Sequence, residues 1–163
     1  GIDPKIFTSD QIKKFFIKHN KFKAISNKVI SKIFNARSHS SKPFFSLSDS
    51  IAGENYEKKI NKVVSWLKKI KSNYIFVSAP ENIAWLLNIR GYDNPNSPIP
   101  NCRLIINDKK KIFLISKKTT AKKLIFEGKL INNQVIEPSN FEKFLNKLKY
   151  GKIVIDKKSC SIF

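Results

Sequence analysis

The sequence predicts an α/β fold in which helices flank a mixed β-sheet. Apolar residues at helical spacing alternate along the chain with short apolar runs typical of strands. Two of these runs are separated by Asn107-Asp108-Lys109, which predicts an antiparallel hairpin. Hydrophobic residues make up 41% of the 163 residues, so the chain can bury a sizeable core.

The first 36 residues predict a helix, a strand and a second helix. Thr8 can cap the first helix, and Gln11 completes a capping box for a helix that extends to about Asn20. Residues 21–25 alternate between polar and apolar types, as a short strand does. Ser26 can cap the next helix. Residues 37–50 are rich in serine and are interrupted by proline, which predicts a linker.

The middle of the chain carries the strongest helical pattern. Apolar residues recur at nearly 3.6-residue spacing over residues 54–72. Acidic residues in its first turn and lysines in its last agree with the helix dipole. Residues 74–78 predict a strand, and Pro80 opens a short helix that ends near Asn88. Trp85, on that helix, is predicted to be a core residue, with a place in a cleft wall as the alternative.

The remaining segments continue the alternation of strands and helices. Residues 90–100 contain three prolines and predict turns, before hairpin strands at 102–106 and 111–115. A helix over about 119–126 ends at Gly128. The last predicted elements are a strand at 135–136, a helix after Pro138 that Gly151 closes, and a buried strand at 153–155.

The net charge of +20 invites a nucleic-acid interpretation. Only Arg37, Arg90 and Arg103 are arginine, however, and the lysines are spread in short runs. Lysine, asparagine and isoleucine share A/T-rich codons, so base composition alone can explain the charge. Functional binding of a polyanion is the alternative that this composition leaves open.

The sequence contains no recognisable catalytic constellation. Its five glycines are isolated, which excludes the glycine-rich phosphate loops. Cys102 and Cys160 are predicted to be small core residues rather than nucleophiles, and His19 and His39 lack metal-ligand spacing. No apolar run approaches the length of a membrane span, and no signal peptide is visible. The opening Gly-Ile-Asp-Pro suggests an excised fragment.

One segment is distinctive: residues 78–93 read SAPENIAWLLNIRGYD. This segment closely resembles the Ser-Ala-Leu-Asp-Glu-Ile-Ala-Trp-Leu-Leu-Asn-Leu-Arg-Gly-Ser-Asp stretch of three-domain Xaa-Pro aminopeptidases (aminopeptidase P). Residues 94–98 are similar to an Asn-Pro loop of that family, and residues 1–4 to its Gly-x-Asp-Pro element. The sequence departs from the family at Pro80-Glu81-Asn82 and at Tyr92, which replaces serine.

The resemblance implies a creatinase/prolidase N-terminal-like (ribonuclease H-like) mixed sheet with flanking helices. Residues 1–36 would form the C-terminal tail of a first such domain, 37–50 a linker, and 51–163 a second domain. The parent enzyme would cleave the N-terminal residue from peptides with proline second. Its catalytic domain holds two metal ions, usually manganese, on two Asp, one His and two Glu. We expect that domain to lie beyond Phe163 and this fragment to be inactive.

In such enzymes the non-catalytic domains wall the active-site cleft and make oligomer contacts. The resemblance therefore implies as cleft-facing candidates Asn88, Arg90, Asp93 and Asn94. Arg90 could bind a peptide carboxylate or carbonyl, or it could pair with Asp93 to shape the turn. The chain itself is expected to contribute no catalytic or metal-binding residue and to bind no cofactor.

The expected partners are the enzyme's own catalytic domain, a peptide substrate and a second copy in a homodimer. No membrane and no specific nucleic acid is expected, and the expected location is the cytoplasm. Two other function classes stay open. They are a lysine-rich polyanion- or nucleic-acid-binding α/β domain, and a structural domain of a parent that has lost activity.

Overall fold

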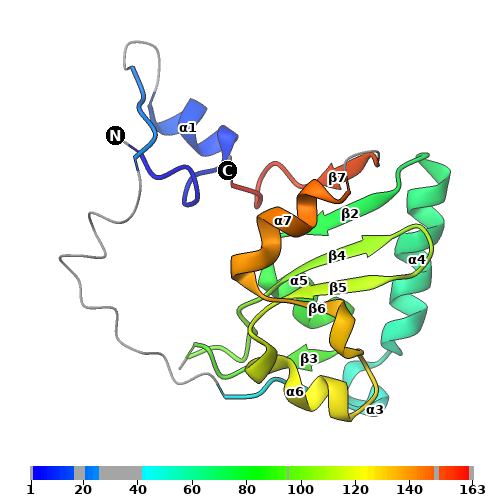
Figure 1. Cartoon of the computed structure of the whole chain (residues 1–163). Coiled ribbons are helices and arrows are strands. Elements are labelled where there is room, and N and C mark those ends of the chain that lie inside the picture. Colours follow the sequence, from blue (N-terminus) through cyan, green and yellow to red (C-terminus); the bar gives the residue numbers. More distant parts are fainter. Residues whose placement is uncertain (1, 17–20, 26–41, 95, 149–150, 162–163) are drawn as a thin grey trace. The chain divides into compact units, whose positions relative to one another are not determined.

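The computed structural model describes residues 2–16, 21–25, 42–94, 96–148 and 151–161 (Figure 1). The chain divides into two compact units. One comprises Gly1–His39 with Asp156–Phe163, and the other comprises Ser40–Ile155. The assignment of these regions to two creatinase-like domains stays a prediction.

The first unit contains helix α1 (Ser9–Phe15). The predicted capping box is confirmed, since the Thr8 hydroxyl accepts from the Gln11 amide and the Gln11 side chain accepts from the Thr8 amide. The helix is shorter than predicted because Phe16 leaves the helical conformation and packs its ring edge-on against Phe7 and Phe22.

The strand predicted at residues 21–25 is reduced to a single parallel bridge between Ile2 and Ala24. The amide of Ile2 donates to the Lys23 carbonyl, and the amide of Ile25 donates to the Ile2 carbonyl. The helix predicted after Ser26, together with His19 and His39, lies outside the described residues.

The second unit is built on a five-stranded mixed sheet with the order β6-β5-β4-β2-β7. Its central strands β2, β4 and β5 are antiparallel, and β6 and β7 add parallel edges. The predicted hairpin and the short strand at 135–136 are therefore confirmed. The strands span Tyr74–Val77 (β2), Arg103–Asn107 (β4), Ile112–Ile115 (β5), Val135–Ile136 (β6) and Ile153–Ile155 (β7).

Helices cover both faces of this sheet (Figure 1). Side chains of α4 (Tyr56–Lys69), α5 (Pro80–Leu86) and α6 (Lys118–Phe126) join one core with Leu104 and Leu114. On the opposite face lies α7 (Phe141–Asn146), where Phe141 stacks on Phe76 at 5.5 Å. The remaining helices are α3 (Asp49–Ala52) and the 3₁₀ turns η1 (Asn132–Gln134) and η2 (Pro138–Asn140).

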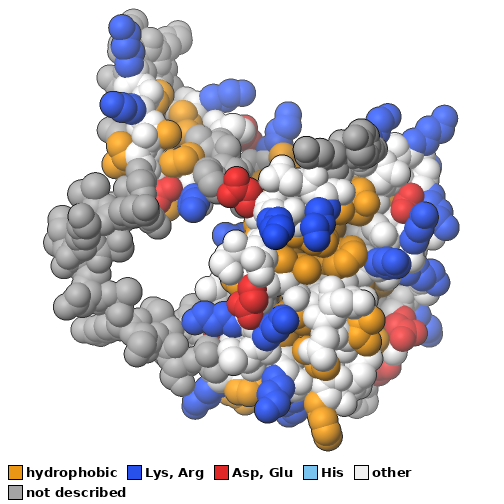
Figure 2. Space-filling model, in the orientation of Figure 1, with side chains coloured by type: hydrophobic (Ala, Val, Ile, Leu, Met, Phe, Trp, Pro, Cys, Tyr) orange, Lys and Arg blue, Asp and Glu red, His pale blue; other side chains and the backbone are white. Residues whose placement is uncertain are grey.

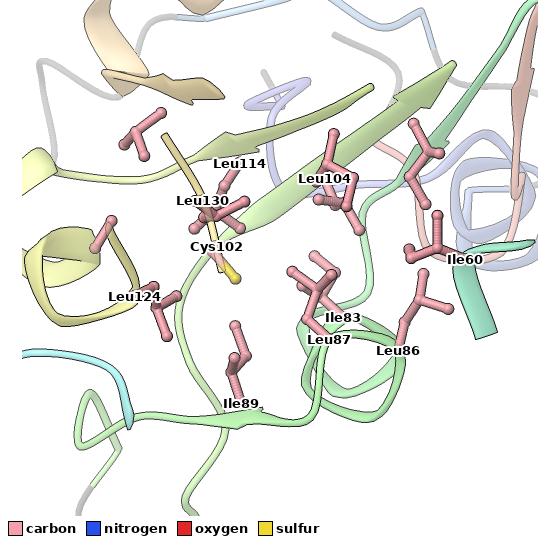
Figure 3. Packing of buried hydrophobic residues seen from close by; sticks show 14 of the residues in the cluster. Ile60, Ile83, Leu86, Leu87, Ile89, Cys102, Leu104, Leu114, Leu124 and Leu130 are labelled. Carbon is pink, nitrogen blue, oxygen red and sulfur yellow. The ribbon is translucent and has the colours of Figure 1, made fainter. Parts of the chain in front are cut away.

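The core lies between the sheet and helices α4, α5 and α6 (Figure 3). Leu104, Leu114, Ile83, Leu87 and Ile89 have no exposed side-chain surface. Burial of such side chains stabilises a fold by roughly 1.5–3 kcal/mol each before the entropic cost of ordering the chain.

Residues expected to form a linker contribute to this core. Phe44 is fully buried, and its amide donates to the Thr120 carbonyl. β1 (Phe45–Ser46) then pairs antiparallel with β3 (Ile89–Arg90). The described part of residues 37–50 is therefore folded, because an aromatic ring and two backbone partners hold it in place.

The prediction that residues 153–155 form a buried strand is wrong in one respect. They form β7, but Ile153 and Ile155 are 37% and 47% exposed. The physical reason is position: β7 is an edge strand that, in the described part of the chain, pairs with β2 alone. An apolar run identifies a strand, but it does not say whether a helix covers that strand.

Candidate functional site

The distinctive segment begins at the carboxyl end of β2 and includes α5 and β3. Pro80 opens α5 at the first position, and Ile83 and Leu86 are buried against the sheet. Asn88 then adopts a left-handed conformation with φ of 51°, which turns the chain into β3. Asparagine tolerates this conformation better than most residues. The predicted helix and its end near Asn88 are confirmed, since α5 ends at Leu86.

Asn88 lies inside the fold, with 2% of its surface exposed. Its Oδ1 accepts from the Lys59 ammonium at 2.7 Å, and its Nδ2 donates to the Glu54 carbonyl at 2.7 Å. Its backbone carbonyl accepts from the Leu47 amide. Asn88 thus joins the start of α4, the end of α5 and the strand β1.

Lys59 is a site residue that sequence reasoning missed. It is 2% exposed, and its ammonium also donates to the Trp85 carbonyl at 2.9 Å. The same ammonium lies 4.3 Å from the centroid of the Trp85 ring. The signal that could have found it is spacing: residue 59 follows Tyr56 by three positions and so falls within the buried stripe of α4.

Arg90 also bonds to backbone groups. Its Nη1 donates to the carbonyls of Ala84 and Ile89 at 3.2 and 2.9 Å. Ion pairs among the described residues are Lys62–Glu54 and Lys123–Glu127, so the alternative of an Arg90–Asp93 pair is not found there.

Asp93 and Asn94 shape the turn-rich loop that follows. The Asp93 carboxylate accepts from the Asn101 amide at 2.7 Å, and the Asn94 side chain accepts from the Asn96 amide at 3.1 Å. Gly91 is packed so closely that a Cβ would lie 2.7 Å from Cα of Pro100. Backbone contact therefore explains the glycine at this position.

Two aromatic side chains of this segment are exposed. Trp85 is 58% exposed and Tyr92 is 55% exposed, so the prediction that Trp85 is a core residue is wrong. Its ring lies over Lys59 instead of entering the core. The Tyr92 ring packs against Phe45 at 5.1 Å, and the Lys42 ammonium lies 5.5 Å from it. We call Phe45, Trp85 and Tyr92 the aromatic set.

A pocket of about 310 Å³ lies between α4 and the β4–β5 hairpin. Tyr56, Ile60 and Lys129 line it, and the Lys129 ammonium donates to the Leu87 carbonyl at 2.9 Å. Partial burial lowers the pKa of Lys129 below its ordinary value. Burial and the neighbouring Glu57 carboxylate raise the pKa of Tyr56.

The described residues do not fit the two metal ions that the family resemblance implies. They hold no group of three or more His, Cys, Asp or Glu side chains that could bind a metal ion. Burial is the first cause that raises the pKa of Cys102 to about 12, which is unsuitable for a thiolate nucleophile. Cys102 is the small core residue that was predicted, while Cys160 is half-buried.

Comparison with known families gives a match over residues 35–163 to the family described as the creatinase/prolidase N-terminal domain. The chain belongs to this family. The resemblance to Xaa-Pro aminopeptidases and the mixed α/β fold class are therefore confirmed. No helix among the described residues has the length and apolar character to cross a membrane.

Individual relatives of this creatinase/prolidase N-terminal domain carry one activity in their names. The chain is 32% identical over 107 residues to a probable Xaa-Pro aminopeptidase P of Leptosphaeria maculans, a match that covers 61% of this chain and 17% of the relative. It is 30% identical over 118 residues to Xaa-Pro aminopeptidase 1 of Dictyostelium discoideum, covering 71% of this chain and 18% of that protein. The chain thus spans less than a fifth of these relatives.

A solved structure shares the fold. The crystal structure of X-prolyl aminopeptidase from Caenorhabditis elegans superposes with a TM-score of 0.64 at 19% identity. The match covers 77% of this chain and 21% of that one. The Caenorhabditis elegans protein is described as a cytosolic enzyme with a di-nuclear active site.

Proposed function

We propose that this chain is a non-catalytic N-terminal or middle domain of a metal-dependent Xaa-Pro aminopeptidase. The parent enzyme would release the N-terminal residue from peptides with proline in second position. The observation that carries the proposal is the family match over residues 35–163, together with relatives named Xaa-Pro aminopeptidase. A cytoplasmic location is proposed because the related Caenorhabditis elegans enzyme is described as cytosolic.

In this proposal the metal chemistry belongs to another part of the parent protein. The two ions, for which we propose manganese, would supply an activated water to the peptide bond. The candidate site of this chain instead consists of a buried Lys59–Asn88 pair and exposed aromatic rings. Such groups can position and enclose a peptide, but they cannot replace the ligands of a dinuclear centre.

We propose that the rings of the aromatic set face the cleft or the dimer partner. Two of its rings are more than half exposed, and Lys59 and Lys42 hold cations over Trp85 and Tyr92. Large aromatic surfaces bind peptides at a low cost in conformational entropy. A wall of this kind excludes water and limits the length of the substrate. Asn88 and Arg90 stabilise the backbone that carries these rings, because their hydrogen bonds lie within the fold.

The test uses the full-length protein that contains this chain, with manganese and an Xaa-Pro tripeptide. Full-length protein should release the first residue, and this chain alone should not. Tyr92→Ala should raise KM by about three- to tenfold with little change in kcat, because one aromatic contact is lost. The control is Phe126→Ala, which removes a ring that is 92% exposed on α6.

Two results would count against the proposal. Release by this chain alone would show that it carries its own catalytic groups. A full-length protein that binds manganese and folds, yet cleaves no Xaa-Pro peptide, would support the alternative of a parent without activity.

A further inference from the structure

Three chain segments bring lysines together at one end of the sheet. The Asn73 carbonyl accepts from the Asp108 amide at 2.9 Å, and the Asn73 side chain accepts from the Lys152 amide at 3.0 Å. Figure 1 shows the end of α4, the β4–β5 turn and the start of β7 at this end. We call the exposed lysines of these segments the lysine edge: Lys68, Lys69, Lys71, Lys109, Lys110, Lys111 and Lys152.

The lysine edge is not neutralised within the described part of the chain. Its seven ammonium groups are absent from the ion pairs found there, which join Lys62 to Glu54 and Lys123 to Glu127. Asp108 is the one acidic residue in the segments that form the edge. Figure 2 shows that other lysines and arginines are distributed over the visible face, so position and backbone conformation must distinguish this group.

Backbone conformation does distinguish it. Among the described residues other than glycine, three have a positive φ, and two of them are Lys71 at 52° and Lys110 at 63°. Lys71 follows the C-cap of α4, where the Ser72 amide bonds back to the Leu67 carbonyl, a position that favours glycine. Lys110 ends the hairpin turn, where the left-handed residue is again usually glycine.

Base composition does not select lysine over asparagine at these two positions. Asparagine tolerates the left-handed conformation better than lysine, and its codons are as rich in A and T. Asn88 occupies the third such position in the described chain. A left-handed lysine motivates a functional explanation of the side chain, and the property that distinguishes Lys from Asn here is the charge.

A pocket adjoins the lysine edge. Lys110 also lines the cavity of about 310 Å³, and the other lining residues are Tyr56, Glu57, Ile60, Asn61, Ile112 and Lys129. An aromatic ring, an amide and apolar side chains around one pocket suit a flat heterocycle with polar edges.

We propose that this end of the sheet binds single-stranded nucleic acid, with phosphates on the lysine edge and one base in the pocket. Lysine ammonium groups attract phosphates without reading base edges, so the binding is independent of sequence and depends on salt. This function is separate from the proposed role in a peptidase, because none of the aromatic set belongs to this surface.

The test measures fluorescence anisotropy of a dye-labelled 12-nucleotide oligouridylate with the whole chain at several salt concentrations. In the variant Lys71→Asn/Lys110→Asn we expect an affinity lower by about tenfold and a salt slope smaller by about 1.4, which is 0.7 for each lysine removed. Its melting temperature should be equal or higher, because asparagine relieves the strain. The matched control Lys118→Asn/Lys122→Asn removes the same charge from exposed positions on α6.

An equal loss in both variants would overturn the proposal, because net charge would then explain the binding. No loss in the Lys71/Lys110 variant would overturn it as well. An oligonucleotide of abasic sites should bind more weakly than oligouridylate, and equal binding would contradict occupation of the pocket by a base. Binding of the whole chain to phosphatidylserine vesicles, but not to oligouridylate, would assign the lysine edge to membranes instead.

Discussion

Lys59 stabilises the start of β3 by interactions with uncharged groups. Its ammonium has two oxygen acceptors and one aromatic ring as partners, and none of these carries a formal charge. A buried cation without a carboxylate gains less from its surroundings than an ion pair does, so its contribution depends on hydrogen bonds. Removal of Lys59 would leave the Asn88 Oδ1 without its partner in a place that water does not reach.

We therefore predict that Lys59→Met lowers the free energy of unfolding by about 1–3 kcal/mol, the cost of leaving buried acceptors unpaired. Chemical denaturation would measure it. The control Lys62→Met removes a 70% exposed partner of Glu54 and should cost less than about 1 kcal/mol. Equal costs in the two variants would show that the buried hydrogen bonds of Lys59 contribute nothing.

Cys102 gives a prediction about pH. Burial raises the pKa of its thiol from 9.0 to about 12, so the folded state keeps a proton that the unfolded state loses. The stability that depends on the protonated Cys102 thiol is complete below pH 9 and declines as the pH rises from 9 towards 12. Between pH 9 and 11 the wild type should lose up to about 1.4 kcal/mol per pH unit more than Cys102→Ala. Denaturation curves at these pH values would measure the free energy of unfolding. If the thiol were accessible, that free energy would change with pH in parallel for the wild type and Cys102→Ala.

The packing of helix α7 against the sheet depends on two phenylalanine rings of that helix. None of its residues is fully buried, and it lies on the sheet face opposite the main core. Strand register explains the contact: Phe76 and Phe113 both pair with Ile105 and so point to the same face. Phe141 and Phe144, three positions apart on α7, pack against Phe76 and Phe113 respectively.

Phe144→Ala should therefore lower the free energy of unfolding by about 2–4 kcal/mol and expose the α7 amides to exchange. Hydrogen exchange monitored along the chain would locate the loss. Lys143→Ala, on the exposed side of the same helix, should change neither quantity appreciably. Unchanged protection of α7 in Phe144→Ala would mean that other contacts hold this helix.

The whole molecule is dominated by repulsion between like charges. The chain has 32 Lys and Arg residues but 12 Asp and Glu residues, which gives a formal charge of +20, and two ion pairs occur among the described residues. Salt screens both repulsion and attraction, and here the repulsive pairs are far more numerous.

We predict that the melting temperature rises by several degrees when NaCl increases from about 20 to about 300 mM. Differential scanning calorimetry would measure it, with sucrose at matched osmolality as a control for effects other than screening. A constant or falling melting temperature would indicate that local ion pairs outweigh the net repulsion.

Periodicity and turn chemistry were sufficient to predict most elements of the sheet unit. The stripe of α4, Pro80 at the start of α5, the hairpin turn and Gly128 after α6 all appear as the sequence indicated. The segment around Trp85 also led to the family. These signals are local: each depends on side chains within a few positions of one another, and local sterics and burial on one face determine the outcome.

The sequence by itself thus determined the α/β class, the family and the order of the longer helices and strands in the sheet unit. Only the tertiary structure decided which side chains are covered. Lys59 is buried and Trp85 is exposed because a ring from α5 covers a lysine from α4, and the two are 26 positions apart. The same holds for Phe44, Asn88 and the lysine edge: burial, pairing and charge density depend on contacts between distant segments, which no local pattern specifies.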